Sequence, residues 1–255
     1  MDLGLKGKKA IVTGATRGIG LATAQNLAAD GCDVAICSRS QEDVDRVVAE
    51  LKGHGVNAYG QAVDLYDMDA YTAWLVKAGD ELGGVDIFVS NVTGGTAMGP
   101  EAWGAWDGYF QVDLMGAVRG FEAVLPRLQA SDAASAIFIS STAAMEHFPP
   151  SPAGFMALKA ALIAQAKTLS KRHGPEGIRV NAVSPGPVYI DGGAWEYVKE
   201  NMRELYDNTM QQIPLGRMAN ADEAGKYIAF VASPAASYIS GSNCILDGGM
   251  TSTVG

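Results

Sequence analysis

The sequence predicts a single-domain α/β fold, in which a doubly wound parallel sheet of about seven strands carries helices on both faces. Short apolar runs alternate with segments of helical periodicity along the 255 residues. The first apolar run leads through a glycine-rich turn into a helix. The composition, with 31 glycines, 48% hydrophobic and 18% charged residues, fits strands that are buried on both sides.

The first predicted unit covers residues 9–29. Its apolar run predicts a strand, and the helical spacing that begins at Leu21 predicts a helix. Between them lie Gly14, Gly18 and Gly20. Glycines permit a tight exit from the strand, a close approach of backbone to a diphosphate, and close packing of helix on sheet. Because the free N–H groups at a helix start favour an anion, the turn predicts a nucleotide-phosphate site.

The rest of the chain continues in the same rhythm. Further strands are predicted at 33–37, 56–63, 85–90, 136–140, 178–183 and 243–246. Helices are predicted over 41–53, from after Leu65 to about 82, and over 107–130, 153–173 and 221–232. A long insertion is predicted at 187–215. Such strands need right-handed crossover connections, which make the sheet parallel. Ligands of these sheets bind beyond the carboxyl ends of the strands, so the functional residues should gather there.

Several motifs occur in order: T-G-x-x-x-G-x-G in the first turn, A-L-K-A-A-L over 157–162, and N-A-V-S-P-G-P-V over 181–188. Together they resemble the short-chain dehydrogenase/reductase family over nearly the whole chain. The resemblance implies a Rossmann-like dinucleotide site. Its implied cofactor-binding residues are Gly14, Thr16, Arg17, Gly18, Ile19, Gly20, Ser38, Arg39, Asp64, Leu65, Asn91, Lys159, Pro185, Gly186 and Val188. The turn after Asn91 departs from the family's N-A-G by one extra residue and by Val92.

The end of the second predicted strand indicates which cofactor binds. An acidic side chain there would accept hydrogen bonds from a free ribose 2′-OH and repel a 2′-phosphate. This chain has Ser38 and Arg39 instead, and the resemblance places Arg17 on the same side. Since guanidinium groups bind phosphate, we expect NADP(H) rather than NAD(H). The alternative is that both arginines are ordinary solvated residues.

The resemblance also implies a reaction centre, in which family members use a Ser, a Tyr, a Lys four residues after the Tyr, and an Asn on the preceding long helix. Ser141 and Lys159 match, and the resemblance gives them the roles of polarising the substrate oxygen and holding the ribose. The position four before the lysine is Phe155, and Asp113 stands where the family has Asn. A phenyl ring has no proton to give, so the usual general acid/base is absent.

Two explanations of Phe155 remain open. The chain is a Tyr-to-Phe variant of an ordinary reductase, or Phe155 is native. In the second case another group moves the proton, with His147, Glu146 and Tyr189 as candidates, or the reaction is a non-redox elimination or cyclisation. A protein that binds NADP(H) without catalysing a reaction is also consistent with a phenylalanine at position 155. Asp113 is expected to cap a hydrogen-bond relay. Asp113 and the turn after Asn91, which is stretched by one residue, favour the explanation that Phe155 is native and arose by natural divergence.

The resemblance makes the insertion at 187–215 a substrate lid. It is rich in aromatic and methionine side chains, as is the loop after residue 94, which favours an apolar or aromatic ketone or alcohol as substrate. These residues are Tyr189, Trp195, Tyr197, Met202, Tyr206 and Met210, with Met98, Trp103 and Trp106 in the loop. The alternative is that most of them pack the lid onto the body or line a subunit contact.

The composition excludes other classes of protein. A net charge of −9 with 19 lysines and arginines opposes nucleic-acid binding. Cys32, Cys37 and Cys244 have no metal-ligand spacing and indicate buried thiols in a reducing compartment. The N-terminus lacks the apolar region of a signal peptide, and no apolar run is long enough to cross a bilayer, so we expect a cytoplasmic protein that does not bind membranes. The resemblance implies a homotetramer or a homodimer.

Overall fold

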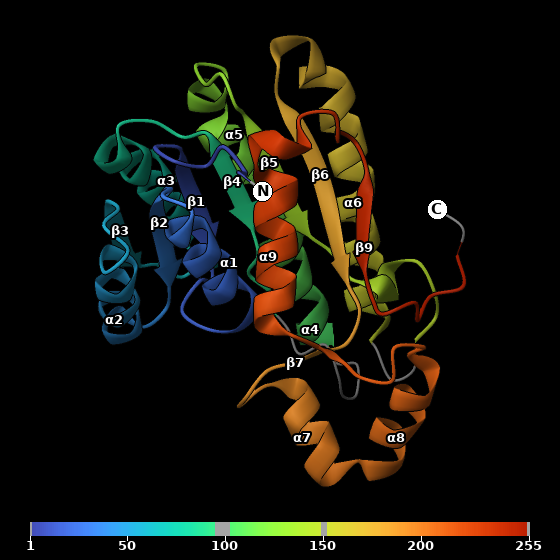
Figure 1. Ribbon diagram of the computed structural model, residues 1–255. Helices are drawn as coiled ribbons and strands as arrows, with labels where there is room; N and C mark the ends of the chain where they lie inside the picture. Colours follow the sequence, from blue (N-terminus) through green and yellow to red (C-terminus); the bar gives the residue numbers. More distant parts are fainter. Residues whose placement is uncertain (1, 95–102, 149–151, 254–255) are drawn as a thin grey trace.

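The computed structural model describes residues 2–94, 103–148 and 152–253. Its centre is a seven-stranded sheet in the order β3-β2-β1-β4-β5-β6-β9, with every neighbouring pair parallel (Figure 1). The strands are β1 (Lys9–Thr13), β2 (Asp33–Ser38), β3 (Ala58–Ala62), β4 (Ile87–Ser90), β5 (Ser135–Ile139), β6 (Arg179–Pro185) and β9 (Asn243–Leu246). The predicted fold class is therefore confirmed.

The strand order reverses between β1 and β4. From β1 the chain runs outward through β2 to β3, then returns to the other side of β1 and builds β4, β5, β6 and β9. Val12 of β1 accordingly lies between Ile36 of β2 and Val89 of β4. Because such sheets bind ligands where the order reverses, the carboxyl ends of β1 and β4 mark the expected site.

Helices cover both faces of the sheet (Figure 1). One face carries α1 (Gly18–Ala29), α2 (Gln41–Lys52) and α9 (Ala221–Ala232), and the other carries α3 (Met68–Leu82), α5 (Gly116–Leu128) and α6 (Ala153–His173). Successive strand residues point to opposite faces, so Ile11 packs with α3, α5 and α6 while Val12 packs with α1, α2 and α9. Burial on both faces explains the unbroken apolar runs.

The predicted long helix over 107–130 consists of three consecutive segments. These are α4 (Trp103–Gly108), a π-helix η1 (Tyr109–Met115), and α5. A π-helix bonds each N–H to the carbonyl five residues earlier, and such wide turns frequently occur at functional sites. Asp113 lies in this segment, so the helix has its unusual geometry where the sequence has its unusual residue.

The insertion after β6 contains regular elements that the sequence analysis did not resolve into helices and strands. They are β7 (Val188–Tyr189), α7 (Ala194–Asn201) and α8 (Arg203–Gln212), followed by β8 (Ala219–Asn220), which pairs parallel with β7. The two helices lie beyond the ends to which the sheet's arrows point (Figure 1). Trp195, Val198 and Ile213 form a small apolar cluster there. The insertion therefore packs as a unit at the carboxyl end of the sheet.

Candidate active site

The turn between β1 and α1 depends on its glycines. Gly14 and Gly18 have φ angles of 65° and 58°, in the left-handed region that residues with a Cβ rarely adopt. A Cβ on Gly20 would collide with the side-chain amide of Asn91 and the carbonyl of Gly14. The Gly14 N–H donates a 2.9 Å hydrogen bond to the Cys37 carbonyl, which holds the turn against the end of β2.

The N-terminus of α1 opens onto this turn without a side-chain cap. Arg17 is the N-cap residue and makes no capping hydrogen bond, and the first turn contains no acidic residue. Ile19 packs toward the core, so the backbone is the polar surface at this end. Free N–H groups and the positive end of the helix dipole favour an anion. The backbone from Thr16 to Gly20 therefore fits the diphosphate of a dinucleotide.

Asn91 joins the end of β4 to the glycine turn. Its side-chain amide donates to the carbonyls of Thr13 and Gly14, at 3.0 and 3.1 Å. Its backbone N–H donates to the Thr13 hydroxyl at 3.0 Å. These bonds fix the exit from β1, so the amide of Asn91 holds the shape of the turn.

The ends of β2 and β3 lie beside the turn and carry polar groups. Ser38 ends β2 with a half-buried side chain, and Arg39 is exposed, as is Arg17. Among the described residues, neither guanidinium has a hydrogen-bond or ion-pair partner. After β3, exposed Asp64 accepts a hydrogen bond from the Tyr66 N–H at 3.0 Å.

Leu65, beside Asp64, is buried in the core and packs near Gly116 at the start of α5. This edge therefore combines an apolar wall with two exposed cations, Arg17 and Arg39.

Ser141 follows β5 and begins the short 3₁₀ helix η2 (Thr142–Ala144). Its hydroxyl accepts a hydrogen bond from the Ala143 N–H at 3.2 Å and is half-buried. The preceding Ser140 donates to the Lys159 carbonyl at 2.7 Å, which fastens the end of β5 to α6. These contacts place Ser141 and Lys159 at the same end of the sheet.

Lys159 is buried, with its side chain 5% exposed. Its ammonium donates to the Ile139 carbonyl at 2.9 Å and pairs with an Asp113 carboxylate oxygen at 3.0 Å. One turn earlier on α6, the Phe155 ring centre lies 5.7 Å from the ammonium. Phe155 also meets Tyr109 edge to face, with ring centres 5.8 Å apart. Residue 155 is thus a packed phenyl ring beside an ion pair.

Asp113 receives three hydrogen bonds or ion contacts, although its side chain is only 1% exposed. Besides Lys159, the Thr93 hydroxyl donates to it at 2.9 Å and the Gly94 N–H donates at 2.7 Å. A buried carboxylate needs such partners to remain charged. Asp113 therefore ties α6 and the turn after β4 to η1.

The segment after β6 completes the arrangement. The Thr142 hydroxyl donates to the Pro185 carbonyl at 3.4 Å, and the Gly186 N–H donates to the Leu246 carbonyl at 2.8 Å. Val188 is buried at the start of β7. A Cβ on Gly18 would lie 3.1 Å from the Ile190 side chain, so the base of the insertion reaches the glycine turn.

Comparison with known proteins identifies the family of this chain. The sequence model of the enoyl-(acyl carrier protein) reductase family matches residues 14–251. The isoepoxydon dehydrogenase of Penicillium expansum is 34% identical over 98% of this chain and 97% of its own length. The chain belongs to the short-chain dehydrogenase/reductase family. It is an oxidoreductase of that type.

Solved structures of this family are similar over nearly the full chain. The L-sorbose reductase of Gluconobacter frateurii, complexed with NADPH and L-sorbose, has a TM-score of 0.89 at 28% identity and covers 100% of both chains. A short chain oxidoreductase of Pseudomonas aeruginosa PAO1, with NADPH bound and described as containing an atypical catalytic center, has a TM-score of 0.86 at 26% identity. It covers 97% of this chain and 98% of its own.

The sequence identifies candidate residues of this site but not the contacts among them. It predicts Asp113 as the cap of a hydrogen-bond relay, whereas the structure shows an ion pair between Asp113 and Lys159. Thr93 was not identified as a site residue, yet it bonds Asp113. One signal was available: an aspartate between apolar residues on a core helix requires a buried cation.

The three other proton-transfer candidates differ in their surroundings. His147 is exposed, and a Glu146 carboxylate oxygen accepts a hydrogen bond from the Ser252 N–H at 2.6 Å. Tyr189 lies under the ammonium of Lys199, 5.4 Å from the ring centre. Desolvation, together with nearby Glu196, raises the pKa of the Tyr189 phenol. None of these groups has a described contact with Lys159.

The aromatic residues predicted to line the lid have several environments. Trp195 is buried and meets Phe148 edge to face at 6.4 Å, while Tyr206 and Met210 pack against the same cluster. Tyr197 and Met202 are exposed. Met98 and the side chain of Trp103 lie outside the described residues, and Trp106 packs beside Phe155. Much of the apolar surface of the insertion therefore packs within the insertion itself.

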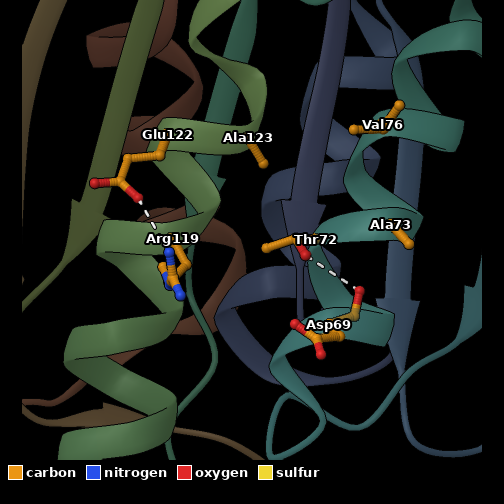
Figure 2. A pocket seen from close by; sticks show the side chains of 7 residues that line it. All are labelled: Asp69, Thr72, Ala73, Val76, Arg119, Glu122 and Ala123. Carbon is orange, nitrogen blue, oxygen red and sulfur yellow. Dashed lines mark hydrogen bonds and ion pairs between the residues drawn. The ribbon is translucent and has the colours of Figure 1, made fainter.

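A groove on the outer helical layer lies apart from these residues. Figure 2 shows the lining side chains on α3 and α5, with Arg119 and Glu122 on α5 and Asp69 beside Thr72 on α3. The groove is lined by Asp69, Thr72, Ala73, Val76, Arg119, Glu122 and Ala123. Arg119 and Glu122 approach to 3.7 Å across one turn of α5. No residue of the glycine turn or of the Asp113 and Lys159 pair lines this groove.

The part of the chain that the structure describes lacks both a metal-binding cluster and a membrane-spanning helix. It contains no group of three or more His, Cys, Asp or Glu side chains that could hold a metal ion. No helix in the same part combines the length and apolar character needed to cross a bilayer. The three cysteines are free and buried, and burial raises the pKa of the Cys37 thiol to about 12.

Proposed function

We propose that this protein is an NADP(H)-dependent oxidoreductase that interconverts an apolar or aromatic ketone and its alcohol. The observation that carries the proposal is the uncapped, glycine-lined N-terminus of α1, which lies at the same end of the sheet as Ser141 and Lys159. When bound, the nicotinamide supplies or accepts the hydride. The residues of this chain bind the cofactor, orient the substrate and transfer the proton.

The choice of NADP(H) rests on charge at the end of β2. Arg39 and Arg17 are exposed and free of partners among the described residues, and Ser38 stands where an acidic residue would exclude a 2′-phosphate. The NADPH-bound Gluconobacter and Pseudomonas structures support this choice. Asp64 and Leu65 would border the adenine, and Pro185, Gly186 and Val188 the nicotinamide.

At the reaction end, Ser141 would orient the substrate oxygen through its hydroxyl. Lys159 would contribute positive charge near the ribose, with one N–H beyond those given to Asp113 and Ile139. The buried apolar residues beside it, including Phe155 and Tyr109, favour an apolar substrate over a sugar or an acid. The apolar insertion would serve as the lid.

Phe155 favours a second candidate function. Without a phenol, the same pocket suits a non-redox reaction, or NADP(H) binding without turnover.

We further propose that the protein is a cytoplasmic homodimer or homotetramer.

The decisive experiment titrates the protein with NADPH and with NADH, following protein fluorescence. NADPH absorbance is then followed against a panel of aliphatic and aromatic ketones, for the native chain and for Phe155→Tyr. We expect tighter binding of NADPH than of NADH. Turnover in the native chain supports a rewired reductase. Cofactor binding without turnover by the native chain, by Phe155→Tyr and by Phe155→Tyr combined with Asp113→Asn supports the second candidate, and no uptake of either cofactor refutes both.

Arg39→Asp tests the cofactor choice, because it replaces a phosphate-binding cation with a group that favours a free 2′-OH. We expect the ratio of NADPH to NADH affinity to fall by about tenfold or more, since a charge-assisted bond contributes about 1.5–3 kcal/mol. Arg172→Asp, an exposed arginine at the end of α6, makes the same change in net charge and should leave the ratio unchanged. An unchanged ratio in Arg39→Asp would refute the assignment of this residue.

A further inference from the structure

Three departures from the family pattern meet at one carboxylate. The sequence places Phe155 on α6, Asp113 on the long helix, and an extra residue in the turn after Asn91. These positions are far apart in the chain, but Asp113 bonds two residues of the stretched turn and also Lys159, the lysine beside Phe155. The three positions therefore lie around a single carboxylate.

The contacts explain why the changes belong together. With a phenyl ring at 155, the ammonium of Lys159 has no phenol oxygen beside it and lies 5.7 Å from the ring centre. A buried ammonium needs an anionic or strongly polar partner, and Asp113 supplies one at 3.0 Å. An asparagine at 113 would offer no negative charge. The exchange of Asn for Asp therefore compensates for the loss of the phenol.

The stretched turn completes the coordination of the carboxylate. One oxygen of Asp113 accepts from Lys159 and from the Thr93 hydroxyl, and the other accepts from the Gly94 N–H. These donors fix the orientation of the carboxylate, so it cannot swing away from the ammonium. The Ile139 carbonyl is the second acceptor of Lys159, and no other described charged group pairs with that ammonium.

We propose that Asp113 is a positioning residue that has taken over from the absent tyrosine as the partner of Lys159, so that residues 113 and 155 function only as a matched pair. This rests on the proposed function. A phenol added at 155 alone would meet a lysine whose charge Asp113 already balances, and the lysine could not favour the phenolate. Both exchanges must be reversed together to rebuild the family's usual centre.

The test is a double-mutant cycle of the native chain, Phe155→Tyr, Asp113→Asn and the double variant. We expect Phe155→Tyr to change turnover by less than about threefold, and the double variant to exceed Phe155→Tyr by about tenfold or more. We also expect Asp113→Asn to bind NADPH about tenfold more weakly, because Lys159 loses its orientation. A gain of about a hundredfold in Phe155→Tyr alone would overturn the proposal, as would native NADPH affinity in Asp113→Asn.

The matched controls repeat both chemical changes away from the site. Asp107→Asn changes an exposed side chain on α4, directly before η1, and Phe110→Tyr adds a hydroxyl to an exposed ring of η1. Both should behave as the native chain does. If Asp113→Asn does not fold, the Phe155→Tyr arm and the double variant still decide, since a double variant no more active than Phe155→Tyr contradicts the matched pair.

A measurement on the cofactor-free protein separates failure of this inference from failure of the proposed function. The ε-carbon NMR signal of Lys159, identified by its absence in Lys159→Arg, reports the surroundings of the ammonium. In Asp113→Asn that signal should move and broaden, because the ammonium loses the partner that fixes its position. An unchanged signal overturns the inference even if NADPH binds, whereas a changed one with no NADPH binding refutes only the function.

Discussion

The candidate site has two sides, of which one is formed by backbone groups and the other by side chains. The cofactor side consists of the turn after β1 and the start of α1, where backbone N–H groups and the absence of Cβ atoms provide the surface. The reaction side consists of η1, α6 and the turn after β4, where side chains provide it. The glycines Gly14, Gly18 and Gly20 fall on the first side, and Asp113, Phe155 and Lys159 fall on the second.

This difference shows which kind of site can change its chemistry. A backbone cradle depends on glycine wherever a Cβ would collide, so its residues have no alternatives. A side-chain centre has more freedom, because a change in one side chain can be balanced by another, as Asp113 balances the buried ammonium of Lys159. Under the proposal made above, the reaction side changes through such linked exchanges.

The largest effect should come from removing the cation of the reaction side. Lys159→Met keeps a chain of similar length but leaves the Asp113 carboxylate buried without its counter-ion. Breaking a buried pair in this way costs about 3–5 kcal/mol of the free energy of unfolding, which urea denaturation measures. Lys167→Met, an exposed lysine on the same helix, should lie within about 0.5 kcal/mol of the native chain. Equal stability of the two variants would mean that the pair is not essential to the fold.

The cofactor side should respond less in stability but strongly in binding. A Cβ in Gly20→Ala would collide with the Asn91 amide and the Gly14 backbone, and overpacking of this kind costs about 1–3 kcal/mol. Because the turn itself must shift, NADPH affinity should fall by about a hundredfold, which fluorescence titration measures. Gly174→Ala is the matched control, since a Cβ there meets nothing within 4 Å and the φ angle is −56°. Normal NADPH affinity in Gly20→Ala would contradict the backbone cradle.

The same contrast explains how much of the molecule the sequence predicts. The strands and most helices follow from periodicity, because a sheet buried on both faces requires unbroken apolar runs such as Ala10 to Val12. The glycine turn follows from stereochemistry. The helix ranges 153–173 and 221–232 agree with α6 and α9 as observed.

What the sequence did not predict depends on packing between distant segments. The π-helix at Tyr109–Met115 interrupts a sequence whose periodicity is helical throughout, and nothing local distinguishes a π turn from an α turn. The partners of Asp113 lie 20 residues before it and 46 after it, so no spacing rule connects them. The helices of the insertion pack mainly on one another, and their short apolar stripes are weak signals.

The smallest effect on stability should come from exposed hydrogen bonds and ion pairs at the start of α9, the helix that packs on α1. Helix α9 packs on α1, and its capping box joins Asn220 and Glu223 through two 2.9 Å hydrogen bonds. The hydrogen bonds from Arg217 and from the Asn220 N–H lower the pKa of Glu223 from 4.5 to about 2. The folded state therefore gains stability from this carboxylate above its ordinary pKa, and that gain disappears as the pH falls through about 2.

Glu223→Gln keeps a side chain that can complete the capping box but removes the charge. We expect it to be slightly less stable than the native chain near neutral pH, and the difference in urea midpoint should shrink from about pH 4.5 downward and vanish near about pH 2. Glu204→Gln, an exposed glutamate at the start of α8, should show no such pH-dependent difference. High salt should also reduce the Glu223 effect, whereas the buried pair of Asp113 and Lys159 is screened much less. If salt and acid reduced the stabilisation from Glu223 and from the Asp113–Lys159 pair equally, the contrast between exposed and buried charges would be wrong.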